Sequence, residues 1–231
     1  MYVAIIIIAV TLLIFGPQFW ARHVLKRYSQ HDEQIPGTGA ELARHLLTRY
    51  GVTGVNVEKT EAGDHYDPLS RTIRLSNENH DTRSLTAIAV AAHETGHALQ
   101  HHRGESLLDL RTRLVYLAAF AEKAGAAAML AIPVVALMTR VPSTGVLMAL
   151  IGFISLGLSV IVHFVTLPVE WDASFNKALP ILMEGNYIET DQLKATHTIL
   201  KACALTYVAS SLASLLNLWR WLAILRPLIR R

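Results

Sequence analysis

The sequence predicts a mainly α-helical membrane protein, in which a water-facing α+β domain with a short β-hairpin is attached to a bundle of three to four membrane helices. Two observations support this fold class. Of the 231 residues, 52% are hydrophobic and only 17% are charged, which is too apolar for a typical soluble domain. The apolar residues also gather in long runs, whereas residues 21–113 are polar enough to face water.

Residues 2–15, YVAIIIIAVTLLIF, predict the first membrane helix. A cleaved signal peptide would carry its positive charges before the apolar core and small residues at a cleavage site. Here Arg22 and Arg27 follow the apolar run, and Trp20 suits a membrane interface. We therefore interpret residues 1–20 as an N-terminal transmembrane anchor that is retained, with its N-terminus outside.

Residues 21–113 are the predicted water-facing domain. A short helix is expected over 37–51, where a glycine ends it. Alternating apolar residues around a Gly/Asp/Pro turn predict a hairpin with strands near 55–60 and 71–75. A second helix is expected over 81–102, with N-cap residues at its start and a glycine beyond its end.

The rest of the chain predicts further membrane helices and one polar segment. Residues 114–169 are expected to form two transmembrane helices, because 124–138 is strongly apolar and 145–169 is long enough to cross a bilayer. Residues 170–202 are polar again, and 203–231 predict a membrane-associated C-terminal helix.

The basic residues predict the orientation. Five arginines and lysines lie near the membrane ends of residues 21–113, whereas the loop at 139–144 carries only Arg140. Because basic residues favour the cytoplasmic side, the domain is expected in the cytoplasm and the loop outside. A fourth complete crossing would leave the basic C-terminus outside, so the last helix is expected to lie on or partly in the membrane.

Composition also limits the chemistry. Cys203 is the only cysteine, so the chain has no intrachain disulfide and no cysteine-based zinc site. The net charge is only +3, and the basic residues lie beside apolar runs rather than along one face, so nucleic acid is not an expected partner. Any metal must therefore be held by His, Asp or Glu.

The motif His-Glu-x-x-His, within AIAVAAHETGHALQHHRGE, predicts a zinc site. Residues four apart lie on one face of a helix, so His93 and His97 can both reach one ion. Imidazole is a good zinc ligand, and Glu94 can act as a general base on zinc-activated water. The alternative is a set of polar residues on an ordinary buried helix, each of which would need a hydrogen-bonding partner.

The residues after the motif exclude the metzincin pattern. That pattern requires Gly and His where this chain has Gln100 and Arg103. His101 continues the same helix, but one straight helix rarely surrounds an ion with three ligands, so we expect His101 to lie in solvent or beside a ligand. The third ligand is therefore expected from another part of the chain.

Glu170, in TLPVEWDASFNKAL, is the best candidate for the third ligand. The predicted topology returns it to the side of the membrane that holds His93. Glu184 and Glu189 lie in a stretch that is typical of a solvated loop. The alternative interpretation of Glu170 is a surface glutamate at the start of a helix, where the helix dipole favours a negative charge.

Two further residues and the hairpin each have two interpretations. His163 lies seven residues before Glu170, close to the same helix face, and points either toward the site or into a hydrogen bond within the bundle. Tyr207 either stabilises an oxyanion or packs in the core or at an interface. The hairpin either offers an edge strand to an extended peptide or serves only as a scaffold.

Four segments resemble a known family: AVAAHETGHALQ, HYDPLSRTIRLS, LPVEWDAS and ALTYVAS. Nearly the whole chain resembles the YugP-type membrane zinc metallopeptidases, and it is more distantly similar to HtpX and the CAAX prenyl proteases. The resemblance implies a zincin-like domain of the gluzincin kind and hydrolysis of peptide bonds. It also implies one zinc ion held by His93, His97 and Glu170, with Glu94 as the base.

The chain departs from the more distant group after Glu170. That group carries an Asp four residues after its ligand Glu, where the Asp supports a zinc histidine. Here Ser174 occupies this position. Asp172 follows Glu170 by only two residues and would point to a different side of a regular helix. Asp172 and Ser174 are therefore the candidates for supporting the zinc ligands.

Motif and resemblance together predict a zinc-dependent endopeptidase at the cytoplasmic surface of a bacterial-type inner or plasma membrane. The expected partners are a lipid bilayer and a peptide or membrane-protein substrate; the sequence leaves the oligomeric state open. The alternative is a membrane scaffold or assembly factor with a structural or inactive zinc site, which four protein ligands would close.

Overall fold

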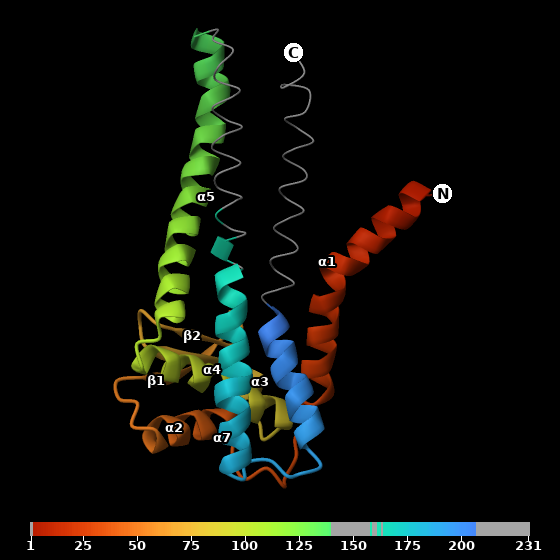
Figure 1. Cartoon of the computed structure of the whole chain (residues 1–231), viewed down its shortest axis with the longest axis vertical. Coiled ribbons are helices and arrows are strands. Elements are labelled where there is room, and N and C mark those ends of the chain that lie inside the picture. Colours follow the sequence, from red (N-terminus) through yellow and green to blue (C-terminus); the bar gives the residue numbers. More distant parts are fainter. Residues whose placement is uncertain (1, 140–157, 159–160, 163, 207–231) are drawn as a thin grey trace.

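The computed structural model describes residues 2–139, 158, 161–162 and 164–206. The labelled elements, in chain order, are α1 (Tyr2–Arg27), α2 (Gly39–Arg49), β1 (Asn56–Thr60), β2 (His65–Asp67), β3 (Thr72–Ser76), α3 (Asn77–Asp81), α4 (Leu85–His102), α5 (Ser106–Thr139), the π-helix η1 (Asp172–Ala178) and α7 (Leu179–Glu184). Two further helical stretches cover 164–171 and 193–206. The sheet and the shorter helices form a compact end, from which α1 and α5 extend (Figure 1).

Local sequence explains where α2 begins and ends. Thr38 and Glu41 form a capping box, in which each side chain accepts a hydrogen bond from the backbone N–H of the other residue. Beyond the helix, Gly51 has a φ of 66°, in the left-handed region that favours glycine. Leu42 and Leu46 are buried on the apolar face, and α2 packs against α4. The helix expected over 37–51 is confirmed.

The sheet corrects the predicted hairpin. β1 and β3 lie where strands were expected, but they pair in parallel, with Val57 opposite Ile73. The short strand β2 lies between them in the chain and pairs antiparallel to β3, with Tyr66 opposite Ile73. The strand order is β1-β3-β2. The predicted hairpin between 55–60 and 71–75 is wrong because the chain reverses twice between these strands.

α4 is the central helix of the compact end. Ser84 caps its N-terminus by accepting a hydrogen bond of 3.1 Å from the backbone N–H of Ala87. Every residue from Leu85 to Gln100 is buried, as expected of a helix surrounded by protein on all sides. The helices α2, α3, α7 and η1 and the strand β2 pack around it.

A glycine allows η1 to approach α4 closely. A Cβ atom on Gly96 would lie 2.8 Å from the carbonyl oxygen of Ala173, so any larger residue would force the two helices apart. η1 has the wide turns of a π-helix, a rare conformation that often occurs at functional sites. This contact brings the end of helix 164–171 against the middle of α4.

The predicted bundle of three to four membrane helices is wrong. Across residues 2–139 and the described part of 158–206, no helix is both long and apolar enough to cross a bilayer. Charged residues lie inside the two longest helices: Arg22 in α1, and Asp109 and Arg111 in α5. The observed fold is mostly helical, with one small three-stranded sheet.

Several predictions concern parts of the chain that lie outside the described residues. These are the loop at 140–144, most of the helix expected over 145–169, the C-terminal segment 207–231, His163 and Tyr207. The interpretations given for them, and the domain boundaries, stay predictions.

Candidate metal centre

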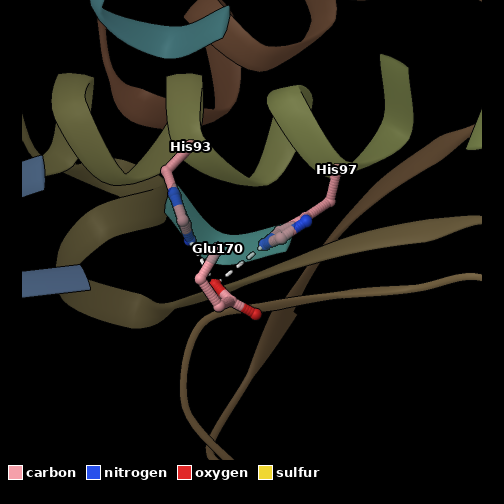
Figure 2. A group of neighbouring side chains, drawn as sticks. All are labelled: His93, His97 and Glu170. Carbon is pink, nitrogen blue, oxygen red and sulfur yellow. Dashed lines mark hydrogen bonds and ion pairs between the residues drawn. The ribbon is translucent and has the colours of Figure 1, made fainter. Parts of the chain in front are cut away.

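Two imidazoles and one carboxylate meet beneath α4. His93 and His97 project from the same face of the helix, one turn apart, toward Glu170 at the end of helix 164–171 (Figure 2). The Nε2 atoms of His93 and His97 lie 3.2 and 3.1 Å from the same oxygen, Oε2 of Glu170. The three possible ligand atoms lie within 4.8 Å of one another. All three side chains are buried, and Glu170 is 0% exposed.

Ser174 fixes the orientation of His93. Its hydroxyl lies 3.0 Å from Nδ1 of His93 and donates its own hydrogen to the carbonyl oxygen of Leu200 at 3.1 Å. Because that hydrogen is already engaged, the hydroxyl oxygen accepts from Nδ1–H of His93. The neutral ring therefore carries its proton on Nδ1 and presents the lone pair of Nε2 to Glu170.

Gln100 fixes His97 in the same way. The amide nitrogen of Gln100 donates to the carbonyl oxygen of Val169 at 3.0 Å and to Oδ2 of Asp172 at 2.8 Å. These two acceptors determine which way the amide points, so its oxygen faces Nδ1 of His97 at 2.9 Å and accepts from it. His97 therefore also presents the lone pair of Nε2 to Glu170.

The resulting arrangement fits a cation. With both Nδ1 atoms protonated, neither Nε2 atom of a neutral ring can donate to the carboxylate, and three electron-rich atoms converge. Two imidazole nitrogens and a carboxylate oxygen are a common ligand set of catalytic zinc, which keeps a further position open.

Glu94 lies beside this group and faces a cavity. It is next to His93 on α4 and lines a cavity of about 250 Å³ together with His93, Asp64 and Cys203. Burial raises the pKa of Glu94 to about 7, His93 opposes this, and the carboxylates of Glu170 and Asp64 add to it. A carboxyl group with a pKa near neutrality can both accept and return a proton.

The structure links both candidate supporting residues, Ser174 and Asp172, to the two histidines. Ser174 touches His93 directly, whereas Asp172 reaches His97 through Gln100. Asp172 is itself held by the ammonium group of Lys177, a contact within the π-helix η1. Asp172 thus supports His97 through a third side chain, a link that the geometry of a regular helix does not predict.

Sequence reasoning also missed Gln100, Lys177 and Arg111. Gln100 follows His97 by three residues, a spacing that puts both on one helix face, and this signal was present in the sequence. Lys177 binds Glu105 as well as Asp172. Arg111 lies 3.3 Å from Oε1 of Glu170, and no local pattern links these two residues.

His101 does not join the centre. Its Nδ1 atom lies 2.8 Å from the hydroxyl of Tyr66, so it ties α4 to β2. Glu184 and Glu189 are both exposed, as predicted, but Glu184 is the last residue of α7 and does not lie in a loop. Among the described residues, His93, His97 and Glu170 are the group of His, Cys, Asp and Glu side chains that can hold a metal ion.

Comparison with known proteins agrees with this geometry. Residues 3–226 match the model of a family described as "Putative neutral zinc metallopeptidase". The chain is also 36% identical over 228 residues to the "Putative membrane protease YugP" of Bacillus subtilis (strain 168), covering 94% of this chain and 95% of the relative. No solved structure matches the chain. The family match spans almost the entire sequence, and the chain therefore belongs to the neutral zinc metallopeptidase family.

Proposed function

We propose that this protein is a zinc-dependent peptidase whose ion is held by His93, His97 and Glu170. The observation that carries the proposal is the convergence of two Nε2 lone pairs and one carboxylate oxygen in a buried site. Membership of a zinc metallopeptidase family supports it. A structural zinc site is closed by four protein ligands, whereas the described part of the chain brings three together. The described residues thus favour a catalytic over a structural site.

The chemistry follows from the position of Glu94. A zinc ion at this site would polarise the substrate carbonyl and lower the pKa of a bound water. Glu94 faces the adjoining cavity and takes the proton of the attacking water. The same carboxyl group then returns this proton to the nitrogen of the departing amine, so the peptide bond is broken without net consumption of protons.

Ser174 and Gln100 keep the two imidazoles ready for the ion. Each accepts from Nδ1–H of one ring, which fixes both the tautomer and the rotation of that ring. The ligands therefore need little rearrangement when the ion binds. Such support of metal-binding histidines contributes to both affinity and activity.

Two cavities support cleavage within a peptide chain. The cavity beside Glu94 includes Asp64, which also lines a second cavity of about 430 Å³ between β2 and α5. β2 is an edge strand of the sheet, and an edge strand can pair with an extended peptide. Because the two cavities lie on either side of Asp64, a peptide could extend in both directions from the cleaved bond. This is the reason to propose an endopeptidase.

We also propose association with a lipid bilayer, with the metal centre on the cytoplasmic side. The Bacillus subtilis relative is named a membrane protease. Three phenylalanines project into solvent from separate helical stretches: Phe19 is 70% exposed, Phe120 71% and Phe164 77%. Other large apolar side chains on the same stretches are exposed as well, among them Phe15, Leu117 and Leu167, and a large exposed apolar surface favours contact with lipid or protein. A peptide or a membrane protein is the proposed substrate, and recovery of the protein with sedimented membranes tests the association with the bilayer.

The function is tested with purified protein and the variant Glu94→Gln. Glutamine keeps the shape of the side chain but cannot take a proton, so zinc content should equal that of wild type while peptide cleavage falls by at least about 100-fold. Glu33→Gln, at an exposed position, is the matched control and should leave both unchanged. Cleavage by Glu94→Gln at the rate of the control would disprove the proposed mechanism.

A further inference from the structure

Arg111 forms a buried ion pair with the proposed zinc ligand. One terminal guanidinium nitrogen of Arg111 lies 3.3 Å from Oε1 of Glu170. The Arg111 side chain is 14% exposed and Glu170 is not exposed at all. Arg111 comes from α5 and Glu170 from helix 164–171, so the pair joins two elements that are far apart in the sequence.

The two oxygens of Glu170 face different partners. Oε2 points to the Nε2 atoms of His93 and His97, and Oε1 points to Arg111 (Figure 2 shows the first of these contacts). A carboxylate can bind an ion through one oxygen or through both. Binding through both would occupy an additional position on the ion, which a catalytic zinc needs for water and substrate.

We infer that Arg111 is a positioning residue that keeps Glu170 bound to the ion through Oε2 alone. This inference rests on the proposed function in one respect only, namely that a metal ion binds at His93, His97 and Glu170. It assigns to Arg111 the task of leaving one side of the ion accessible.

The chemistry of arginine suits this task. A guanidinium group is always charged, is planar and is more weakly hydrated than an ammonium group, so it is the preferred cation for a buried pair with a carboxylate. Because the partner is buried, removal of the cation would leave Oε1 without its opposite charge. Turning toward the ion would then be the nearest way for Oε1 to regain a positive partner.

Arg111 also lies close to where a substrate would pass. It lines the cavity of about 430 Å³ with Asp64, Tyr66 and Tyr116. Because Arg111 is proposed to act through Glu170, its replacement should lower kcat. Its place at the cavity wall means that KM can rise as well.

Cobalt substitution tests the inference independently of peptide cleavage. Co²⁺ replaces zinc in the whole protein, and its visible absorption is strong with four ligands and weak with five or six. Wild type should show strong bands. Arg111→Gln, which removes the charge, should bind Co²⁺ but give weak bands, and its zinc form should lose about 10- to 100-fold in kcat. Arg113→Gln, exposed on the same helix, is the matched control and should behave like wild type.

The outcomes separate this inference from the proposed function. Bands and kcat of Arg111→Gln equal to those of Arg113→Gln would overturn the inference. Should Arg111→Gln fail to fold or to bind the metal, Arg111→Met decides, because it also removes the charge but keeps a long unbranched side chain. Its bands must be weaker than those of wild type, and a wild-type spectrum overturns the inference. A weakened spectrum of Arg111→Gln in a protein that cleaves no peptide at all would disprove the peptidase and leave the role of Arg111 standing.

Discussion

Replacing Gln100 should weaken the metal centre without touching a metal ligand. Gln100 is 1% exposed and its oxygen is the acceptor for Nδ1–H of His97. When the Gln100 side chain is removed, Asp172 keeps Lys177 and Asn176 as partners. His97, in contrast, loses the acceptor of its Nδ1–H. A buried donor without an acceptor costs about 1–3 kcal/mol of the free energy of unfolding. Loss of a hydrogen bond to a metal-binding histidine lowers metal affinity about 10- to 100-fold, which is about 1.4–2.8 kcal/mol.

The assay measures zinc affinity of Gln100→Ala by competition with a coloured chelator, and stability by denaturant unfolding of the metal-free protein. Gln192→Ala is the control, because Gln192 also makes a local hydrogen bond, to the backbone N–H of Glu189, but on a part of the chain remote from the motif. Gln100→Glu should bind zinc with an affinity between those of wild type and Gln100→Ala. Its carboxylate can still accept from Nδ1–H of His97, but it would face the carboxylate of Asp172, which repels it. Zinc affinity of Gln100→Ala equal to that of Gln192→Ala would refute the role of Gln100, even if stability falls.

Two further substitutions test the fold that positions the centre. Gly96→Ala should lower the free energy of unfolding by about 1–3 kcal/mol through overpacking, because its Cβ would meet the Ala173 carbonyl oxygen at 2.8 Å. Gly16→Ala is the control, because a Cβ at this position would meet nothing within 4 Å. Equal stability of the two variants would contradict the close contact. The hydrogen bond from Ser70 lowers the pKa of Asp67 from 3.8 to about 2 against the effect of burial. The carboxylate therefore stabilises the fold above pH 3.8 and loses this effect as the pH falls toward about 2. Unfolding of Asp67→Asn should differ from wild type at neutral pH and converge with it in acid; a difference that does not change with pH would contradict this.

Local signals in the sequence were sufficient where one short segment determines the structure. The glycine at position 51 indicated where α2 ends, whereas the capping box of Thr38 and Glu41, a local pattern that was also present, was found only in the structure. The spacing of His93 and His97 was enough to place both on one helix face, and the structure brings Glu170 to them. Each of these inferences needs only the geometry of a helix or a single contact between elements.

The sequence did not predict the features that depend on how distant segments of the chain pair with one another. Alternating apolar residues predict strands but not their partners, so the three-residue strand β2 and the parallel pairing of β1 with β3 were missed. The expected membrane bundle was wrong, because no helix among the described residues is both long and apolar enough to cross a bilayer. The ion pair of Arg111 with Glu170 joins positions 59 apart, beyond any local pattern.

The π-helix η1 also affected which contacts could be predicted from the sequence. On a regular helix Asp172 would turn away from the centre, yet within the segment that includes the π-helix η1 it reaches the amide of Gln100. Ser174 contacts His93 from the same segment. A π-helix has no sequence signature as clear as a capping box, so the link from Asp172 to His97 required the structure.

The most direct test of the metal centre is the zinc content of Glu170→Ala after mild chelation. Glu170 is the proposed ligand that comes from outside α4, and its loss would leave two imidazoles, which hold zinc less firmly than three ligands. Glu184→Ala is the control, since Glu184 is an exposed carboxylate at the end of α7. We expect Glu170→Ala to lose its zinc under conditions in which wild type and Glu184→Ala keep theirs. Zinc retained by Glu170→Ala as firmly as by wild type would contradict this expectation.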